Sequence, residues 1–507
     1  MFVQQRLARD LWIVGRATII GQIIGVATSV SLRWLLDPAA LGVWQSLRLF
    51  LSYGNYLNLG ASKGAARELS VATGRGNVQA VTDDLHTAHT LNLLSSLAFA
   101  VVLAGASWWC STFATATSAA WSMGLAFLAI FVVLHRQITF HITLLRAEQR
   151  FDTAARQSVY EGLAALLLGT AGAWLAGLPG LLGATLLVAG ASLVYLQRHA
   201  TFRLSWTWDR SRAARLIGIG GPILLTGAFT TLFRSIDRLT LLACSPTAAF
   251  DVGCYSTALL VGSQLYGLAS ITGTVASPKL AQLFGATNDT PAVSRFAAET
   301  TLTQLLWLTP LGASAIVIGP TLLGALFPAY HAGLAALPAV VVATLLATVA
   351  LNGSNVLIAI GEERAALRGL IVSTLITSVA MIVAAVGWPS VTGVASAACV
   401  GNLVYAATSG YAGLWRRLPH AERRVSLTLH ALTLLPILGV AIVLEQLSPG
   451  VGDRSWLDMG NALVKLIVVG AVSLIVALTV SRAARRITVP DKHRAFDDSA
   501  VPPEALR

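Results

Sequence analysis

The sequence predicts an all-α protein that crosses a lipid membrane many times. Hydrophobic residues make up 55% of the 507 residues, and the mean hydropathy is +0.71. Only 11% of the residues are charged, whereas an ordinary soluble protein carries roughly 25%. Because so few charges cannot cover a soluble globule of this size, we expect lipid to be its main solvent. At roughly 20 residues per span, the chain has room for about 12 to 14 transmembrane helices.

Fourteen apolar windows of spanning length divide the chain, and we predict a transmembrane helix over each. The windows are 12–34, 41–60, 88–108, 121–145, 158–177, 180–198, 216–243, 253–275, 300–319, 335–358, 367–386, 391–413, 426–445 and 460–481. Two neighbouring pairs must be joined by very short turns, at Gly177-Leu178-Pro179-Gly180 and at Gly387-Trp388-Pro389.

The loop charges predict the orientation of these helices. With the N-terminus in the cytoplasm, the cytoplasmic segments hold 27 Lys and Arg residues and the opposite loops hold one, Arg454. Cytoplasmic loops of membrane proteins collect Lys and Arg in this way, so we expect both termini in the cytoplasm. The same rule accounts for the net charge of +12 without a nucleic-acid partner.

The short loops argue against an enzyme. The longest, at about residues 61–87, is too short to fold as a separate domain. A membrane-embedded polymerase or glycosyltransferase usually displays a large outer loop with catalytic acids. The chain also has no Gly-Lys dipeptide, and therefore no Walker A loop for ATP. We expect no catalytic residues, no metal ion and no cofactor.

Seven cations lie within the predicted spans, where only three acids oppose them. An intramembrane charge is costly unless it faces water, a partner or a ligand. Several of the seven lie near a helix end, from which a long side chain can reach the headgroups. Arg48 and Arg136 lie deeper, whereas Arg33 and Arg234 lie near the outer ends of their helices.

Polar residues share a helix face with several of these arginines, at about 100° of rotation per residue. The aligned residues predicted to line a cavity are Gln22, Ser29, Gln45, Ser52 and Asn55. The arginines predicted to bind an anion in that wet, cationic cavity are Arg48, Arg33, Arg136 and Arg234. The alternative is a set of separate structural pairs, such as Arg234 with Asp237.

The predominance of arginine predicts an anionic ligand. A planar guanidinium can hold a phosphate or a carboxylate with two hydrogen bonds. Export of cationic drugs would instead require buried acids, which are nearly absent from the middle of the spans. We assign structural or gating roles to Asp237, Arg238 and Pro222, because Pro222 interrupts helical hydrogen bonding near the start of window 216–243.

Three groups of sequence strings are similar to those of a known family. The string Arg33-Trp-Leu-Leu-Asp-Pro-Ala-Ala-Leu-Gly-Val-Trp44 resembles the first hairpin of the oligosaccharide flippases, which belong to the multidrug/oligosaccharidyl-lipid/polysaccharide exporter superfamily. Leu57-Asn-Leu-Gly60 and Arg67-Glu68 resemble the loop that follows it. Ile236-Asp237-Arg238, followed by Gly253-Cys-Tyr255, resembles the signature of the second half.

This resemblance implies two six-helix lobes around a central cavity, followed by two C-terminal helices. It divides the chain into an N-terminal lobe (1–198), a C-terminal lobe (199–413), two extra helices (414–481) and a cytoplasmic tail (482–507).

The resemblance also implies a cargo, an undecaprenyl-diphosphate-linked oligosaccharide. Such a flippase moves its cargo across the bacterial cytoplasmic (inner) membrane by alternating access, for O-antigen, capsule or exopolysaccharide synthesis. We expect Arg48 and Arg33 to hold the diphosphate. Expected partners besides the lipid bilayer are the polysaccharide polymerase and export machinery.

Three alternatives remain open on the sequence: a multidrug-type antiporter of the same superfamily, a membrane-embedded glycan polymerase or transferase, and a scaffold that transports nothing.

Overall fold

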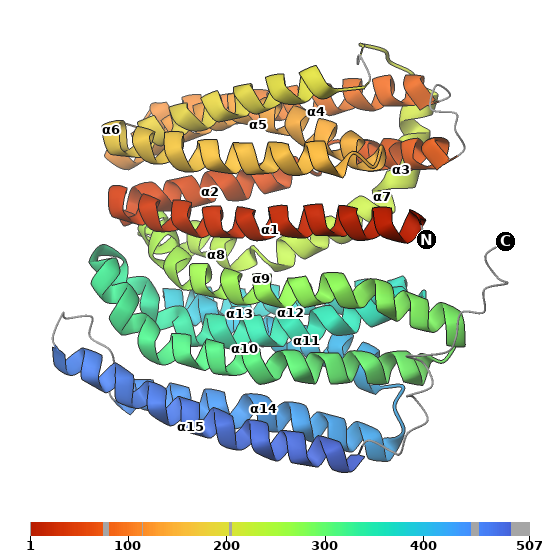
Figure 1. The fold of residues 1–507 in the computed structure, drawn as a ribbon. Coiled ribbons are helices and arrows are strands. Elements are labelled where there is room, and N and C mark those ends of the chain that lie inside the picture. Colours follow the sequence, from red (N-terminus) through yellow and green to blue (C-terminus); the bar gives the residue numbers. More distant parts are fainter. Residues whose placement is uncertain (1, 75–80, 114, 202–204, 448–455, 488–507) are drawn as a thin grey trace.

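The computed structural model describes residues 2–74, 81–113, 115–201, 205–447 and 456–487. These residues form helices joined by short connections, and no strand occurs among them. The helices lie side by side in one elongated bundle (Figure 1). Helix α1 (Phe2–Leu35) begins and α15 (Trp456–Ile487) ends at the same end of this bundle, which we call the terminal end. The opposite end is called the far end.

The first six helices form the N-terminal group. They are α1, α2 (Pro38–Gly54), α3 (Ala61–Gly74), α4 (Thr82–Ser111), α5 (Ala116–Ala147) and α6 (Phe151–His199). Helix α6 turns back on itself at Gly177, which has a φ of 62°. The two halves touch so closely at Gly172 and Gly180 that a side chain on Gly180 would collide with the Gly172 carbonyl oxygen. The short turn predicted at this place is therefore present.

The next nine elements form the C-terminal group. They are α7 (Arg210–Phe233), α8 (Ile236–Cys244), α9 (Ala248–Thr287), α10 (Thr290–Leu326), the 3-10 helix η2 (Pro328–Ala336), α11 (Leu337–Ala359), α12 (Glu363–Gly387), α13 (Val391–Tyr405) and the π-helix η3 (Ala406–Trp415). The last two helices, α14 (His420–Leu447) and α15, pack against α10 at the edge of this group.

The protein is a multi-pass membrane protein. Ten of its described helices are long and apolar enough to cross a membrane, and a bent pair within α7, Arg210–Gly221 and Leu224–Phe233, brings the number up to eleven. Helix α6 counts once among the ten, although its two halves correspond to two predicted windows. The number of fourteen spans stays a prediction, as do the division into lobes and the side of the membrane on which the termini lie.

Two segments differ from what the sequence predicts. The segment 61–87, predicted as a loop, contains α3 and the start of α4. Helix α3 is too polar to span a membrane, but its small residues let it lie against α7, and a side chain on Gly64 would collide with the Leu216 carbonyl oxygen. Window 216–243 is not one helix, because it breaks between α7 and α8 at Arg234 and Ser235.

Side-chain caps fix the starts of α2 and α7. The Asp37 carboxylate accepts a hydrogen bond from the Ala40 backbone N–H at 2.9 Å, and Pro38 occupies the first turn of α2, where its missing N–H does no harm. The Asp209 carboxylate caps α7 by accepting from the backbone N–H groups of Ser211 and Arg212 at 2.8 and 3.2 Å. Both starts lie at junctions between the helix groups.

Two clusters of buried apolar side chains cross between the groups. One joins Leu41 and its neighbours in the N-terminal group to Ala249 and Tyr330, at the far end. The other joins Leu69 of α3 to Leu216 of α7, at the terminal end. The two groups therefore contact each other at both ends of the bundle.

Candidate functional site

The break between α7 and α8 brings three charged residues together. Arg234 ends α7, and the chain leaves helical geometry at Ser235 before α8 starts at Ile236. The Arg238 guanidinium donates to the Arg234 carbonyl oxygen at 2.8 Å. It also lies 3.6 Å from a carboxylate oxygen of Asp237. Because the carbonyl groups that end a helix lack a helical partner, Arg238 satisfies one of them here.

Asp237 holds α8 against α9. Its side chain is buried, with one carboxylate oxygen accepting from the Tyr255 hydroxyl at 2.8 Å and the other from the Arg238 backbone N–H at 2.7 Å. The pairing of Arg234 with Asp237, considered from their spacing, is not formed, because Asp237 pairs with Arg238 instead. This acid is thus occupied by protein donors.

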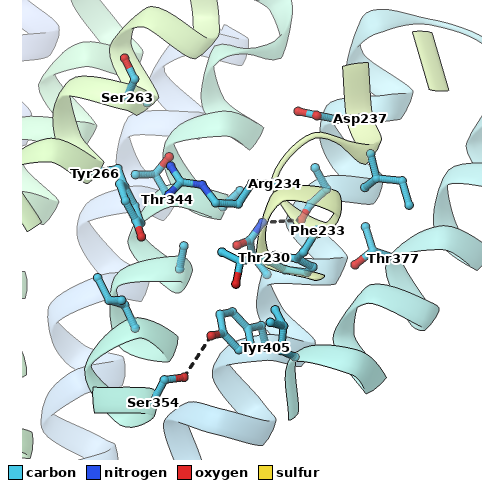
Figure 2. Close-up of a pocket in the computed structure, with 18 of the residues that line it drawn as sticks. Thr230, Phe233, Arg234, Asp237, Ser263, Tyr266, Thr344, Ser354, Thr377 and Tyr405 are labelled. Atoms are coloured by element: carbon cyan, nitrogen blue, oxygen red, sulfur yellow. Dashed lines mark hydrogen bonds between the residues drawn. The ribbon is translucent and has the colours of Figure 1, made fainter. Parts of the chain in front are cut away.

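A cavity of about 920 Å³ lies within the C-terminal group, next to this break. Helices α7, α8, α9, α11, α12 and α13 all contribute to its wall. Figure 2 shows Arg234 and Tyr266 on one side of it and Tyr405 on another. The wall also carries Asp237 and Arg238, so the cavity begins at the charged cluster.

Arg234 lies flat against an aromatic ring in this cavity. Its guanidinium carbon is 4.0 Å from the centre of the Tyr266 ring, a cation–π contact. The side chain is exposed to the cavity space, and no carboxylate of a described residue lies within ion-pair distance of it. Tyr405 is fixed nearby, because its hydroxyl bonds to that of Ser354 at 3.0 Å and its ring meets Phe233 edge-on. Sequence reasoning missed Tyr266 and Tyr405, because single aromatic residues in apolar spans give no signal.

Arg48 lies on α2, the helix of the N-terminal group that contacts the α7–α8 break. Most neighbouring residues of α2 are buried, but the Arg48 side chain is exposed in the interior of the bundle. Helix α2 touches the break itself, because the Tyr53 hydroxyl hydrogen-bonds to the Ser235 hydroxyl at 2.6 Å. Arg48 makes no ion pair with any residue that the structure describes. Arg48 and Arg238 thus belong to two segments, α2 and the α7–α8 break with its following helix, that meet across the two helix groups.

Arg33 bonds to the two residues of α9 that follow Tyr255. Its buried guanidinium donates to the Ser256 carbonyl oxygen at 2.8 Å, to the Thr257 hydroxyl at 3.2 Å and to the Ser29 carbonyl oxygen at 2.8 Å. Since Ser256 and Thr257 belong to α9, Arg33 ties the two groups together. Its donors are used by the protein itself.

Arg136 is buried within the N-terminal group. It donates to the Asn92 side-chain oxygen at 2.6 Å and to the Gly54 carbonyl oxygen at 2.5 Å. These bonds tie α5 to α4 and to the C-terminal end of α2. Of the four arginines predicted to bind one anion, only Arg234 lines the cavity described above.

The predicted polar lining residues lie along α1 and α2. Gln22 packs against Gly267 of α9, and the Ser52 hydroxyl donates to the Leu49 carbonyl oxygen within its own helix. Gln45 is partly exposed, as is Asn55, the residue that follows the end of α2. The side chain of Pro222, to which we assign a gating role, lies outside the described residues, although its backbone belongs to α7.

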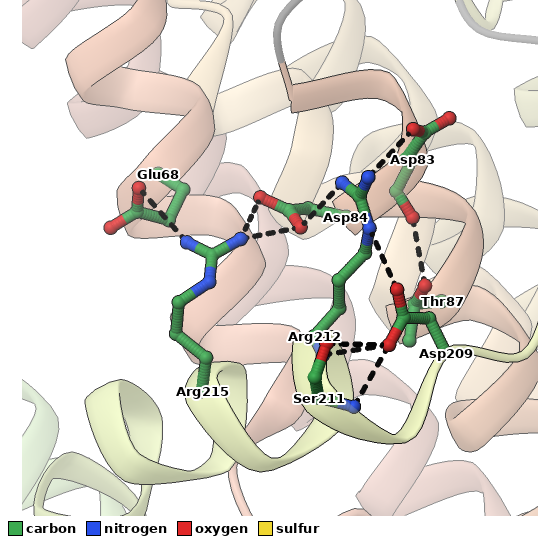
Figure 3. Close-up of polar contacts among 8 residues, drawn as sticks. All are labelled: Glu68, Asp83, Asp84, Thr87, Asp209, Ser211, Arg212 and Arg215. Carbon is green, nitrogen blue, oxygen red and sulfur yellow. Dashed lines mark hydrogen bonds and ion pairs between the residues drawn. The ribbon is translucent and has the colours of Figure 1, made fainter.

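An ion cluster that sequence reasoning missed joins the groups at the terminal end (Figure 3). Asp84 of α4 is buried and accepts two hydrogen bonds from Arg215 of α7, at 2.6 and 2.7 Å. Arg212 reaches Asp83 at 3.0 Å, and Arg215 lies 3.8 Å from Glu68. In the sequence, the cluster corresponds to the Asp83-Asp84 pair and to the Arg212-Ala-Ala-Arg215 motif. Both are also typical of ordinary loop charges, so neither predicts the contact.

The loop residue Asp209 keeps its negative charge beside this cluster. Hydrogen bonds from the Ser211 hydroxyl and from the backbone N–H of Arg212 lower the pKa of Asp209 to about 2. It is therefore ionised across the physiological pH range and remains a partner for Arg212, whose Nε lies 3.1 Å away.

Close backbone packing joins the groups at the far end. A side chain on Gly42 of α2 would lie 1.6 Å from the Ala249 carbonyl oxygen of α9, and one on Gly253 would lie 1.8 Å from the Pro38 carbonyl oxygen. The Tyr330 hydroxyl adds a hydrogen bond to the Leu36 carbonyl oxygen at 2.7 Å. Only glycine permits this approach of two helices.

Solved structures of membrane transporters share this fold. The lipid II flippase MurJ, in an inward closed conformation, superposes with a TM-score of 0.67 at 13% identity, over 93% of this chain and 99% of that one. An inward-facing multidrug resistance MATE family transporter of the MOP superfamily gives 0.58 at 13% identity, over 82% and 98%. A MOP superfamily transporter from Pyrococcus furiosus gives 0.54 at 16% identity, over 82% and 96%.

Sequence comparison identifies the family. No curated protein sequence matches the chain. The profile of a family described as "Polysaccharide biosynthesis protein" matches residues 32–332, which is more than half of the chain and includes both the α7–α8 break and the two contacts between the groups. The chain therefore belongs to the polysaccharide biosynthesis protein family, and it has the fold of the flippases and transporters of the MOP superfamily.

Proposed function

We propose that this protein flips an undecaprenyl-diphosphate-linked oligosaccharide from the cytoplasmic to the outer leaflet of the bacterial inner membrane. In this proposal the terminal end of the bundle faces the cytoplasm, as the loop charges predict. The observation that carries the proposal is the contact of α2, which carries Arg48, with the break that holds Arg238: the Tyr53 hydroxyl bonds to that of Ser235 at 2.6 Å, and no acid is paired to Arg48 among the described residues.

Two cations on these meeting segments favour an anionic ligand between them. Charges of like sign repel strongly in the low dielectric of a membrane protein interior, and a polar group inside the membrane most often marks a substrate path. A diphosphate would relieve the repulsion between Arg48 and Arg238 and would offer each guanidinium a pair of oxygens. Arg33 and Arg136, whose terminal guanidinium nitrogens donate to protein oxygens, then act in the framework around this site.

Alternating access follows from the two contacts between the groups. Separation of Asp84 from Arg215 would open the central space toward the terminal end. Separation of α2 from α9 at Gly42 and Gly253 would open it toward the far end. The described conformation, with the two groups in contact at both ends, is the intermediate in which a bound headgroup is enclosed while the polyprenyl chain lies in the lipid.

The membrane potential favours movement in the proposed direction. A charge that crosses the membrane gains or loses about 2.3 kcal/mol per 100 mV. Because the cell interior is negative, each negative charge of the diphosphate gains this free energy on moving outward. The potential alone can therefore bias the flippase toward export.

A multidrug-type antiporter is the second candidate, because a multidrug resistance MATE family transporter shares the fold. Such a transporter needs a carboxylate that is available to a cation or a proton. Of the two acids in the cavity wall, Asp237 is occupied by Tyr255 and Arg238, and Glu363 lies exposed at the start of α12. The charge of the site therefore supports the flippase over the antiporter.

Proteoliposomes that contain a fluorescent polyprenyl-diphosphate oligosaccharide test the proposal. A quencher added outside measures how fast headgroups become accessible, with and without an imposed potential. The parent protein should raise this rate above that of empty liposomes, and Arg48→Gln should lower it at least tenfold. Arg210→Gln, which removes an exposed arginine at the terminal end, is the matched control and should keep the parent rate. No rise over empty liposomes under either condition would contradict the proposal.

A further inference from the structure

We infer that the cavity within the C-terminal group holds the sugars that are attached to the diphosphate. This inference rests on the proposed function and adds to it a separate binding site for the saccharide. It assigns the space enclosed by α7, α8, α9, α11, α12 and α13, rather than the space between the two helix groups, to the glycan.

The position of Arg238 links the two sites. Arg238 lies in the wall of the cavity, and α2, which carries Arg48, contacts the break three residues before it through the Tyr53–Ser235 hydrogen bond at 2.6 Å. The first sugar of the cargo is bonded directly to a phosphate. A diphosphate held between Arg48 and Arg238 therefore places that sugar at the entrance of the cavity, while the polyprenyl chain leaves on the other side of the phosphates.

The aromatic residues of the wall are suited to sugar rings. The Arg234 guanidinium fixes Tyr266 by lying 4.0 Å from its ring centre, and Ser354 fixes the hydroxyl of Tyr405. Rigid aromatic side chains offer large apolar faces at a low cost in conformational entropy, together with a polar end. The apolar C–H face of a sugar ring can lie on such a surface.

Amide and hydroxyl groups complete the wall. Asn355, Asn402 and Ser263 line the cavity together with several threonines. An asparagine side chain both donates and accepts hydrogen bonds, as sugar hydroxyls do. A few polar groups within a mostly apolar wall are also what fixes the orientation of a ligand in binding pockets generally.

The charges of the wall exclude the polyprenyl chain as the occupant. Three charged residues, Arg234, Asp237 and Arg238, line one part of the cavity, and Glu363 and Arg364 line another. A hydrocarbon packed against these side chains would remove water from them without offering hydrogen bonds, which is strongly unfavourable. The volume of about 920 Å³ is at the upper limit of ordinary ligand pockets, which run from roughly 300 to 1,000 Å³, so it can hold a short oligosaccharide.

Binding measurements on the full chain in lipid nanodiscs test this inference. The probes are sugar-free polyprenyl diphosphate and a panel of polyprenyl-diphosphate disaccharides with neutral, N-acetylated or acidic sugars. We expect the parent to bind at least one disaccharide probe tenfold or more tightly than the sugar-free probe, a factor that corresponds to one or two hydrogen bonds. Ala347→Phe, which fills the cavity, and Tyr266→Leu should each remove this preference.

Two controls separate the cavity from the diphosphate site. Ile376→Phe adds the same ring to an exposed position on α12 and should keep the preference. Arg48→Gln should weaken all probes by the same factor. A parent that binds every probe equally, or an Ala347→Phe variant that keeps its preference, overturns the saccharide site while the flippase stands. A parent that binds none of the probes overturns both.

Discussion

The buried carboxylate of Asp84 accepts two hydrogen bonds from Arg215, at 2.6 and 2.7 Å, and thereby joins α4 of the N-terminal group to α7 of the C-terminal group (Figure 3). Arg212 and Glu68 extend this contact across the terminal end of the bundle. Because the pair is charge-assisted and largely shielded on the Asp84 side, it contributes more than an ordinary surface ion pair. We interpret it as the contact that keeps the terminal end closed.

Breaking this contact should open the terminal end. Asp84→Asn removes one charge of the pair and should shift the population of conformers toward a longer separation of α3 from α7. Spin labels at Ser70 and Ala214, both exposed, report that separation by double electron–electron resonance. Arg295→Gln is the control, because it breaks a similar ion pair, with Glu422, that does not join the two helix groups. An unchanged distance distribution in Asp84→Asn would show that the pair does not hold this end closed.

Gly42→Ala should open the far end. The new methyl group would lie 1.6 Å from the Ala249 carbonyl oxygen, so α2 and α9 must move apart. Cys254, which is fully buried beside this contact, should then react faster with a maleimide in a variant whose other three cysteines are replaced by serine. Gly105→Ala meets no neighbouring atom within 4 Å and should leave the labelling rate unchanged. Equal labelling in both variants would contradict the prediction.

Arg33→Gln should change the conformational equilibrium without weakening diphosphate binding. Arg33 donates to Ser256 and Thr257 across the far end, and the loss of hydrogen bonds from a charged donor costs about 1.5–3 kcal/mol each. We expect faster labelling of Cys254 and an affinity for polyprenyl diphosphate within twofold of the parent. A tenfold weaker affinity would instead place Arg33 in the anion site, as the sequence alone predicts.

Arg136→Gln should destabilise the N-terminal group. The substitution leaves the Gly54 carbonyl oxygen and the Asn92 side chain without the donors they now have, at about 1–3 kcal/mol for each buried acceptor. A thermal unfolding midpoint several degrees below that of the parent, in the same detergent, is the expected result. An unchanged midpoint together with lost flipping would show that Arg136 contacts the cargo.

The sequence predicts the membrane fold well because apolar windows and loop charges are strong local signals. It also predicts the tight turn within α6, since Gly177 and Pro179 leave few other conformations. It does not separate the roles of the arginines. The depth of Arg33 and Arg136 in their helices, and their helical phase, indicate that each needs a polar partner. These two properties do not distinguish a bound ligand from a carbonyl oxygen on a neighbouring helix, such as that of Gly54.

The remaining features depend on contacts between distant segments. Helix α2 meets the second half of the chain at the break at Ser235, where Tyr53 bonds to the Ser235 hydroxyl, and no glycine or proline at that point predicts the break. A search for apolar windows does not detect helix α3, because the helix is polar. Its position follows from the close approach of Gly60 and Gly64 to α7.

A double-mutant cycle on the flipping rate tests the central claim, that Arg48 and Arg238 hold the same anion. The parent, Arg48→Gln, Arg238→Gln and the double variant are compared in proteoliposomes that contain the fluorescent polyprenyl-diphosphate oligosaccharide. Residues that grip one ligand together show non-additive effects, so each single variant should lose at least tenfold and the double variant little more than the worse single. The claim would be contradicted if the fold-losses in flipping rate of the two single variants multiplied in the double variant, as they do for independent sites. It would also be contradicted if either single variant flipped the cargo at the parent rate.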